Sequence, residues 1–134
     1  MNTARTIGSA LLLTALTGLA SCQESLEDRC AREAREYTRK NCPVMVDRNI
    51  QMDSMTFDRA THTIGYVYSV KGALDDSLTI NSNNPRALLL QQVRNSPNLK
   101  LYKEAAYSFR YTYYSSQKKG TKLFEATFHD KDYR

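Results

Sequence analysis

Two stretches of the chain alternate between apolar and polar residues with a period of two. The apolar positions are Ile64, Tyr66, Tyr68 and Val70 in residues 61–70, and Tyr107, Phe109, Tyr111 and Tyr113 in residues 107–116. Such alternation is typical of a strand that buries one face. We therefore expect two strands whose tyrosine-rich sides face a core. Their other sides, which include Arg110, Thr112 and Tyr114, should point away from it.

Each of these strands has a second extended region beside it in the sequence. Residues 44–57 form either one strand or two strands with a break near Asp47, and residues 58–60 form the turn that follows. Residues 121–129 return after a loop at 117–120, where Gly120 can adopt a positive φ. Residues 71–83 are expected to be a polar loop, with a short extended piece at 78–80 as an alternative.

Apolar residues recur at helical spacing in two other regions. In residues 26–40 they form a narrow stripe; Ser25 is placed to cap the first turn, and Pro43 ends the helix because the residue before a proline disfavours the α conformation. A second helix begins at Asn84 and Pro85, with Asn84 as its N-cap, and ends near residue 95. Residues 98–106 fit either a helical turn or a connector.

The predicted element order is therefore helix, strand, strand, repeated twice. Because strands joined by tight turns pair as antiparallel hairpins, we expect an α+β fold with a four-stranded antiparallel sheet. Both helices should pack on one face of that sheet, the tyrosine-rich one. We interpret residues 26–134 as a single α+β domain.

The N-terminal residues have the character of an export signal. A polar start with one cation, Arg5, is followed by an apolar run over residues 7–19 and by the small residues Ala20 and Ser21. These features make a secretory signal peptide, and the run is shorter than the about 20 apolar residues of a membrane span. We therefore assign residues 1–21 to a signal peptide that is removed.

Residues 19–22, Leu-Ala-Ser-Cys, resemble the lipobox of bacterial lipoproteins. The resemblance implies that Cys22 carries diacylglycerol and a further acyl chain such as palmitate, with residues 22–25 as a lipidated tether. Two or more acyl chains anchor a protein stably to a bilayer. Gln23 after the cysteine implies the outer membrane, on its periplasmic leaflet or at the cell surface. The alternative is an ordinary signal peptide with a coincidental cysteine.

Charge and cysteine content limit the classes of partner. The chain has 19 Lys and Arg against 14 Asp and Glu, and the two signs are interspersed, which is typical of a solvated surface. Since export removes nucleic acid as a partner, we expect a membrane and an unknown envelope protein or polymer. If residues 26–40 are helical, twelve residues hold Cys30 and Cys42 about 18 Å apart, which is too far for a disulfide and favours two buried thiols. The alternative is a helix that stops early and allows the disulfide.

Catalytic and cofactor motifs do not stand out in the sequence. His62 and His129 have no metal-type spacing, and no nucleophile elbow or phosphate-binding loop is present. We therefore expect a non-catalytic binding or scaffold module without cofactor or metal. Arg110, Thr112 and Tyr114 are the candidate partner-binding residues, because outward tyrosine and arginine are typical of interfaces. Two alternatives are an inhibitor or immunity-type protein that docks an exported enzyme, and a hydrolase of envelope polymers.

The domain itself carries only a weak resemblance. Residues 43–47 follow a Pro-x-x-Val-Asp pattern and resemble small, uncharacterised bacterial envelope lipoproteins. The tandem helix–strand–strand order is similar to that of β-lactamase-inhibitor-like and PepSY-type binding modules. These resemblances imply a binding role but no activity.

Overall fold

The first helix begins and ends close to where the sequence predicts. In a computed structural model, which describes residues 22–134, α1 spans Leu26–Asn41. The backbone N–H of Asp28 donates to Ser25 Oγ at 3.0 Å, so Ser25 is the N-cap. The helix buries Cys30, Ala31 and Ala34 against the sheet.

The sheet has five strands rather than four, so the predicted four-stranded antiparallel sheet is wrong. The strands are β1 (Val44–Asp47), β2 (Ile50–Asp58), β3 (Thr63–Val70), β4 (Ser108–Ser115) and β5 (Lys122–Phe128). They lie side by side in sequence order. The extra strand comes from the break at Asp47, which makes β1 and β2 a hairpin of their own. Three neighbouring pairs are antiparallel, but β3 and β4 are parallel.

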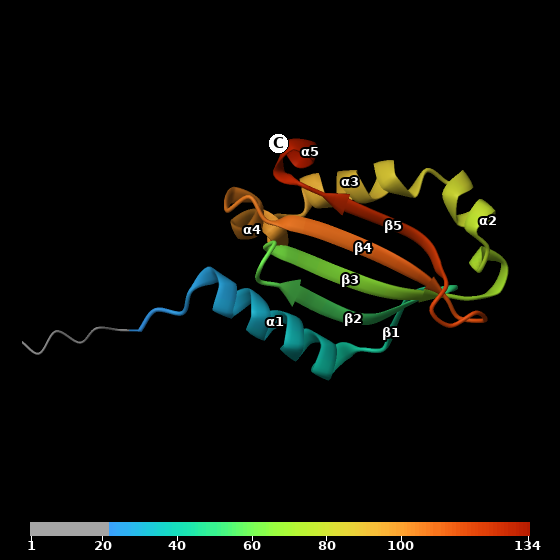
Figure 1. Cartoon of the computed structure of the whole chain (residues 1–134), viewed down its shortest axis with the longest axis horizontal. Coiled ribbons are helices and arrows are strands. Elements are labelled where there is room, and N and C mark those ends of the chain that lie inside the picture. Colours follow the sequence, from blue (N-terminus) through green and yellow to red (C-terminus); the bar gives the residue numbers. More distant parts are fainter. Residues whose placement is uncertain (1–21) are drawn as a thin grey trace, which may run out of the picture.

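A helical crossover explains the parallel pair. After β3 the chain forms η1 (Gly72–Leu74), α2 (Ser77–Ser82), α3 (Pro85–Asn95), η2 (Pro97–Leu99) and α4 (Lys100–Glu104). These elements carry the chain back along the sheet, so β4 starts at the same end as β3 (Figure 1). The expected loop at 71–83 is thus largely helical, and residues 98–106 take the helical alternative. Asn84 precedes α3 as predicted, but its side chain makes no capping hydrogen bond.

The C-terminal residues also differ from the prediction of a polar tail. They form α5 (Asp130–Tyr133), and Tyr133 is buried. Its hydroxyl donates to the carbonyl of Tyr107 at 2.7 Å, and its ring meets Phe109 edge-on. The end of the chain is therefore part of the core.

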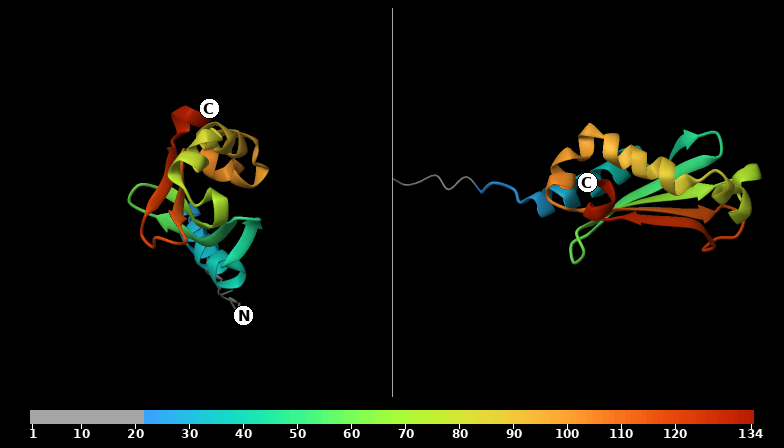
Figure 2. Two further views of the ribbon diagram at one scale, coloured as in Figure 1. Left: turned by 90° about the vertical axis from the view of Figure 1, so that its right-hand side faces the viewer. Right: turned by 90° about the horizontal axis from the view of Figure 1, so that it is seen from above.

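The helices lie on one side of the sheet, and the core lies between the helices and the sheet (Figure 2). The predicted inward-facing residues do face the core: Tyr107, just before β4, is buried, as are Phe109 and Tyr111 within it, and Tyr113 is half-buried. Phe109, Ile64 and Phe128 are completely inaccessible to solvent.

The part of the chain that the structure describes contains no helix long and apolar enough to cross a membrane.

Candidate functional site: a tyrosine-lined groove

Four tyrosines form two stacked pairs on the helix-bearing face of the sheet. The parallel register of β3 and β4 places Tyr66 beside Tyr111 and Tyr68 beside Tyr113. The ring centroids are 4.9 Å and 4.6 Å apart, with interplanar angles of 21° and 12°. Since each ring face packs against its partner, the tyrosines present their edges and hydroxyl groups to the space above the sheet.

That space is only partly filled by helices. Two adjoining hollows of about 470 Å³ each share Tyr66, Asn98 and Leu99 in their linings. One extends along α1, past Glu33, Tyr37 and Asn41, and the other reaches the end of α3. We call the two together the tyrosine groove. Its lining residues are Glu33, Glu36, Tyr37, Lys40, Asn41, Met55, Tyr66, Tyr68, Gln92, Asn95, Ser96, Asn98, Leu99, Tyr102 and Tyr111.

The tyrosine hydroxyls of the groove floor lack protein partners. Within residues 22–134, the hydroxyls of Tyr66, Tyr68 and Tyr111 form no hydrogen bond with another side chain or with the backbone. By contrast, the hydroxyls of Tyr102 and Tyr133 are both bonded. Burial raises the pKa of all three floor tyrosines further above neutrality. None of the three hydroxyls is among the buried polar atoms without a partner, so they contact solvent and are available to a ligand.

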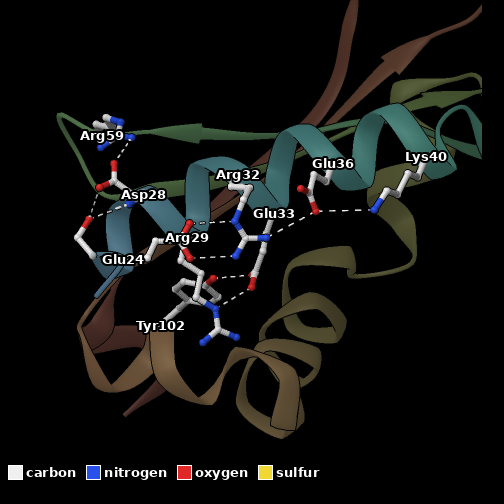
Figure 3. A network of polar contacts seen from close by, with 10 residues as sticks. Glu24, Asp28, Arg29, Arg32, Glu33, Glu36, Lys40, Arg59 and Tyr102 are labelled. Atoms are coloured by element: carbon white, nitrogen blue, oxygen red, sulfur yellow. Dashed lines mark hydrogen bonds and ion pairs between the residues drawn. The ribbon is translucent and has the colours of Figure 1, made fainter. Parts of the chain in front are cut away.

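One end of the groove is closed by a contact between α4 and α1. The hydroxyl of Tyr102 donates to Glu33 at 2.6 Å, and Arg29 donates to the same carboxylate at 2.7 Å (Figure 3). Burial alone would raise the pKa of Glu33, but the hydrogen bonds from Tyr102 and Arg29 hold it below its usual value. The closed end lies beside the middle of α1, where Glu33 is located, and the groove continues along that helix toward Asn41.

The charges along α1 are largely neutralised by one another. Arg32 bonds Glu24 at 2.9 Å and lies 3.6 Å from Glu36, which also lies 3.8 Å from Lys40 (Figure 3). The hollow that ends at α3 has no charged residue in its lining. The groove as a whole therefore offers hydroxyl and amide groups rather than net charge.

The three sequence-predicted binding residues lie on the opposite face of the sheet. Arg110 and Tyr114 are half-buried there, and Arg110 Nε is 3.4 Å from Thr127 Oγ1. Thr112 is buried because it lies between the flanking strands β3 and β5. Its hydroxyl donates to Glu125 at 2.9 Å. The structure brings the three onto one face, but only Arg110 and Tyr114 can contact a partner.

Both histidines lie at the start of β4. The His62 side chain contacts Glu27 at 2.5 Å and stacks on Tyr107, and the His62 carbonyl accepts from the backbone N–H of Ser108 at 3.0 Å. His129 is exposed, and its Nδ1 lies 2.8 Å from Oγ of the buried Ser108. Neither histidine lines the tyrosine groove. In residues 22–134 no three His, Cys, Asp or Glu side chains are grouped to hold a metal ion.

The cysteines fit the sequence analysis as far as the structure describes them. Cys30 is buried in α1 and Cys42 follows its last residue, so an unbroken helix separates two free thiols. Burial raises the pKa of Cys30 to about 12. Cys22 is exposed, and the residues Leu19, Ala20 and Ser21 before it lie outside the described part of the chain.

Sequence reasoning identified the tyrosines but interpreted them only as core. The amides of the groove were missed: Gln92 and Asn95 near the end of α3, and Asn98 in η2. The sequence feature that could have identified these amides is a cluster of Gln, Asn and Ser over residues 91–98, directly after an apolar helix face. Without the crossover, nothing in the sequence places that cluster above the sheet.

Comparisons with known proteins identify the family and the fold. A search of curated proteins found no match. A solved structure with the same fold is PA3611 from Pseudomonas aeruginosa, described as a presumptive secreted protein. It aligns with a TM-score of 0.64 at 14% sequence identity, over 82% of this chain and 98% of that one. Residues 25–124 match the sequence family described as a domain of unknown function, DUF8479, and the chain belongs to that family.

Proposed function

We propose that this protein is an exported, lipid-anchored and non-catalytic binding module of the cell envelope, and that its ligand occupies the tyrosine groove. The observation that carries the proposal is the set of unpartnered hydroxyls of Tyr66, Tyr68 and Tyr111 on the floor of an open groove. Ligand sites in proteins are concave, partly apolar and furnished with a few polar groups, and their volumes are about 300–1,000 Å³. The two hollows fit that description.

The anchor is supported by the lipobox-like residues 19–22 and by the exposure of Cys22. Three residues, Gln23 to Ser25, separate that cysteine from α1. An acylated Cys22 could therefore enter a bilayer without disturbing the fold. The shared fold with a presumptive secreted protein agrees with export. Gln23 favours the outer membrane.

A binding role is favoured over the two other functions considered. The hydrolase alternative needs converging histidines and carboxylates in one pocket, whereas His62 and His129 each contact a different element. The inhibitor alternative would use the outer sheet face around Arg110 and Tyr114. That face has two half-buried candidates, while the groove has several unpartnered donors, so the groove is the stronger site.

Two measurements test this proposal. First, the processed wild-type chain should partition into a detergent phase, and Cys22→Ser should remain unprocessed or soluble. Equal partitioning of both would refute the anchor.

Second, a photoreactive phenylalanine analogue is placed at Leu99 in the groove or at Tyr114 on the opposite face, in membranes that carry the protein. Adducts should form from position 99 and not from position 114. Adducts from position 114 alone would instead place the working surface at Arg110 and Tyr114. Adducts from neither position would contradict a binding module that uses the sheet.

A further inference from the structure

We infer that the ligand of the tyrosine groove is an uncharged peptide segment in an extended conformation, lying along the strands between α1 and α3. This inference rests on the proposed function and names the chemical class of its ligand. It follows from three features of the groove: the spacing of the tyrosine pairs, the absence of unpaired charge, and the orientation of the aromatic rings.

The spacing of the tyrosine pairs matches an extended backbone. Tyr66 and Tyr68 are two residues apart on β3, and their partners on β4 are two residues apart as well. Two residues of a strand span about 6.6 Å, so the two rows of hydroxyls repeat at about that distance. Carbonyl groups two residues apart point to the same side of a β-strand and repeat at about 6.6 Å, whereas same-side carbonyls of a polyproline II chain are about 9.3 Å apart. Successive tyrosine rows can therefore each donate to a carbonyl of one extended chain.

The groove runs in the direction that such a chain requires. α1 and α3 flank the sheet and follow the direction of its strands (Figure 1). The linings of both hollows include Tyr66, so the floor is continuous from one to the other. Beside the middle of α1, the bond between Tyr102 and Glu33 closes one end of the groove. A chain would thus enter from the end at Asn41.

The polar groups of the groove suit a neutral backbone. Phenol hydroxyls and the side-chain amides of Gln92, Asn95 and Asn98 can each donate or accept a hydrogen bond. The charged residues of the α1 wall are already paired: Glu33 with Arg29, and Glu36 with Arg32 and Lys40. A charged ligand would have to break these pairs or remain unpaired, whereas a peptide backbone carries no charge.

The ring orientations favour a peptide over a sugar polymer. A sugar ring would stack on an open aromatic face, but on the groove floor Tyr66 and Tyr68 already stack on Tyr111 and Tyr113. An exposed tyrosine ring, that of Tyr37, lies on the α1 wall and not on the floor. Leu99 and Met55 add apolar surface to the lining beside the hydroxyls. A peptide supplies apolar side chains for such residues and carbonyls for the floor hydroxyls, and a chain already extended in solution loses less entropy on binding.

The test measures binding of two neutral probes to the processed, lipidated chain in detergent. The first probe is a short peptide of alternating threonine and valine, which favour an extended β conformation, acetylated and amidated so that it carries no charge. The second is an oligosaccharide of N-acetylglucosamine. We expect the peptide to bind with NMR shift changes at Tyr66, Tyr111 and Asn98, and the oligosaccharide to cause none. Binding of the oligosaccharide alone, or of neither probe, would overturn the inference.

Matched hydroxyl deletions on one strand locate the binding. Tyr111→Phe removes a groove hydroxyl and should weaken peptide binding roughly three- to ten-fold. Tyr114→Phe removes a hydroxyl on the opposite face of β4 and should leave binding unchanged. Asn98→Ala, at the rim, gives a second weakened variant if Tyr111→Phe alters the fold. Equal affinity of Tyr111→Phe, Asn98→Ala and wild type would overturn the inference. Adducts from position 99 together with no peptide binding would leave the proposed function standing and refute only the peptide.

Discussion

The contact between Tyr102 and Glu33 gives the most discriminating test of the structure. Tyr102 is buried, at 5% exposure, and its hydroxyl donates to a carboxylate that is 35% exposed. A hydrogen bond to a charged group contributes about 1.5–3 kcal/mol, and partial exposure of Glu33 argues for the lower end. Tyr102→Phe should therefore lower the free energy of unfolding by about 1–2 kcal/mol near neutral pH.

The cost of Tyr102→Phe should depend on pH in a defined direction. The pKa of Glu33 is lowered in the folded state, because the bonds from Tyr102 and Arg29 outweigh its burial. Such a group stabilises the fold fully above its unfolded pKa, and this contribution is lost as the pH falls through the folded pKa. The variant keeps only the bond from Arg29. The difference in stability between wild type and Tyr102→Phe should thus be larger at about pH 7 than at about pH 3.5.

Tyr133→Phe is the matched control for this measurement. Tyr133 is buried to a similar degree, but its hydroxyl donates to a neutral carbonyl, that of Tyr107. Loss of the Tyr133 hydroxyl should lower the free energy of unfolding by about 0.5–1.5 kcal/mol, by the same amount at both pH values. Urea unfolding of the three proteins at both pH values gives the comparison. A pH-independent cost for Tyr102→Phe would mean that Tyr102 does not bond to an ionised Glu33, and the groove would then be open at that end.

Other predictions concern the two faces of β4 and the thiols. Phe109→Ala should lower the free energy of unfolding by roughly 3–5 kcal/mol, because Phe109 is fully buried. Arg110→Ala and Tyr114→Ala should each cost less than about 1 kcal/mol; losses equal to that of Phe109 would mean that the outer face is buried too. A thiol reagent should modify half-buried Cys42 before buried Cys30 in the folded protein, and both after unfolding without reductant. A quantitative crosslink between them would contradict an unbroken α1.

Local sequence patterns were sufficient for most elements. Ser25 and Pro43 bounded the first helix, and the alternation around Phe109 gave β4 with the correct face inward. The break at Asp47 was one of two stated alternatives. These features depend on contacts between residues close in sequence, where capping, proline sterics and strand alternation act directly.

The arrangement of the sheet could not be obtained in the same way. No local sequence pattern in β3 or β4 indicates whether the two strands pair in parallel, because the pairing depends on the helical connection between them. Residues 71–83 are polar and lack strong periodicity, so they indicated a loop. In the structure Asp76 caps α2 by accepting from the backbone N–H of Thr79 at 2.8 Å. This short helix joins η1, α3, η2 and α4 in the crossover that returns the chain to the end of the sheet where β3 starts.

The groove shows why a tyrosine-rich strand face is ambiguous in sequence. A tyrosine can bury its ring and still present its hydroxyl to solvent, so the same alternation describes a closed core and a lined groove. Tyr107 and Tyr111 illustrate the ambiguity. Tyr107, just before β4, and Tyr111, within it, both face inward and are almost equally buried, at 4% and 6% exposure, yet of these two only Tyr111 lines the groove. The outcome depends on the crossover and not on the strand.

The proposed anchor and the groove are linked through α1. Three tether residues span at most about 10 Å, so a lipidated Cys22 would keep the start of α1 close to the bilayer. The groove-lining residues of α1 run from Glu33, in the middle of the helix, to Asn41 at its far end. Seven residues of helix, about 10 Å, separate the first of them from the start of α1. A long, flexible tether would let the domain move away from the bilayer, whereas the short segment from Gln23 to Ser25 would keep the groove close to the membrane surface, which gives this segment a physical role in the proposed function.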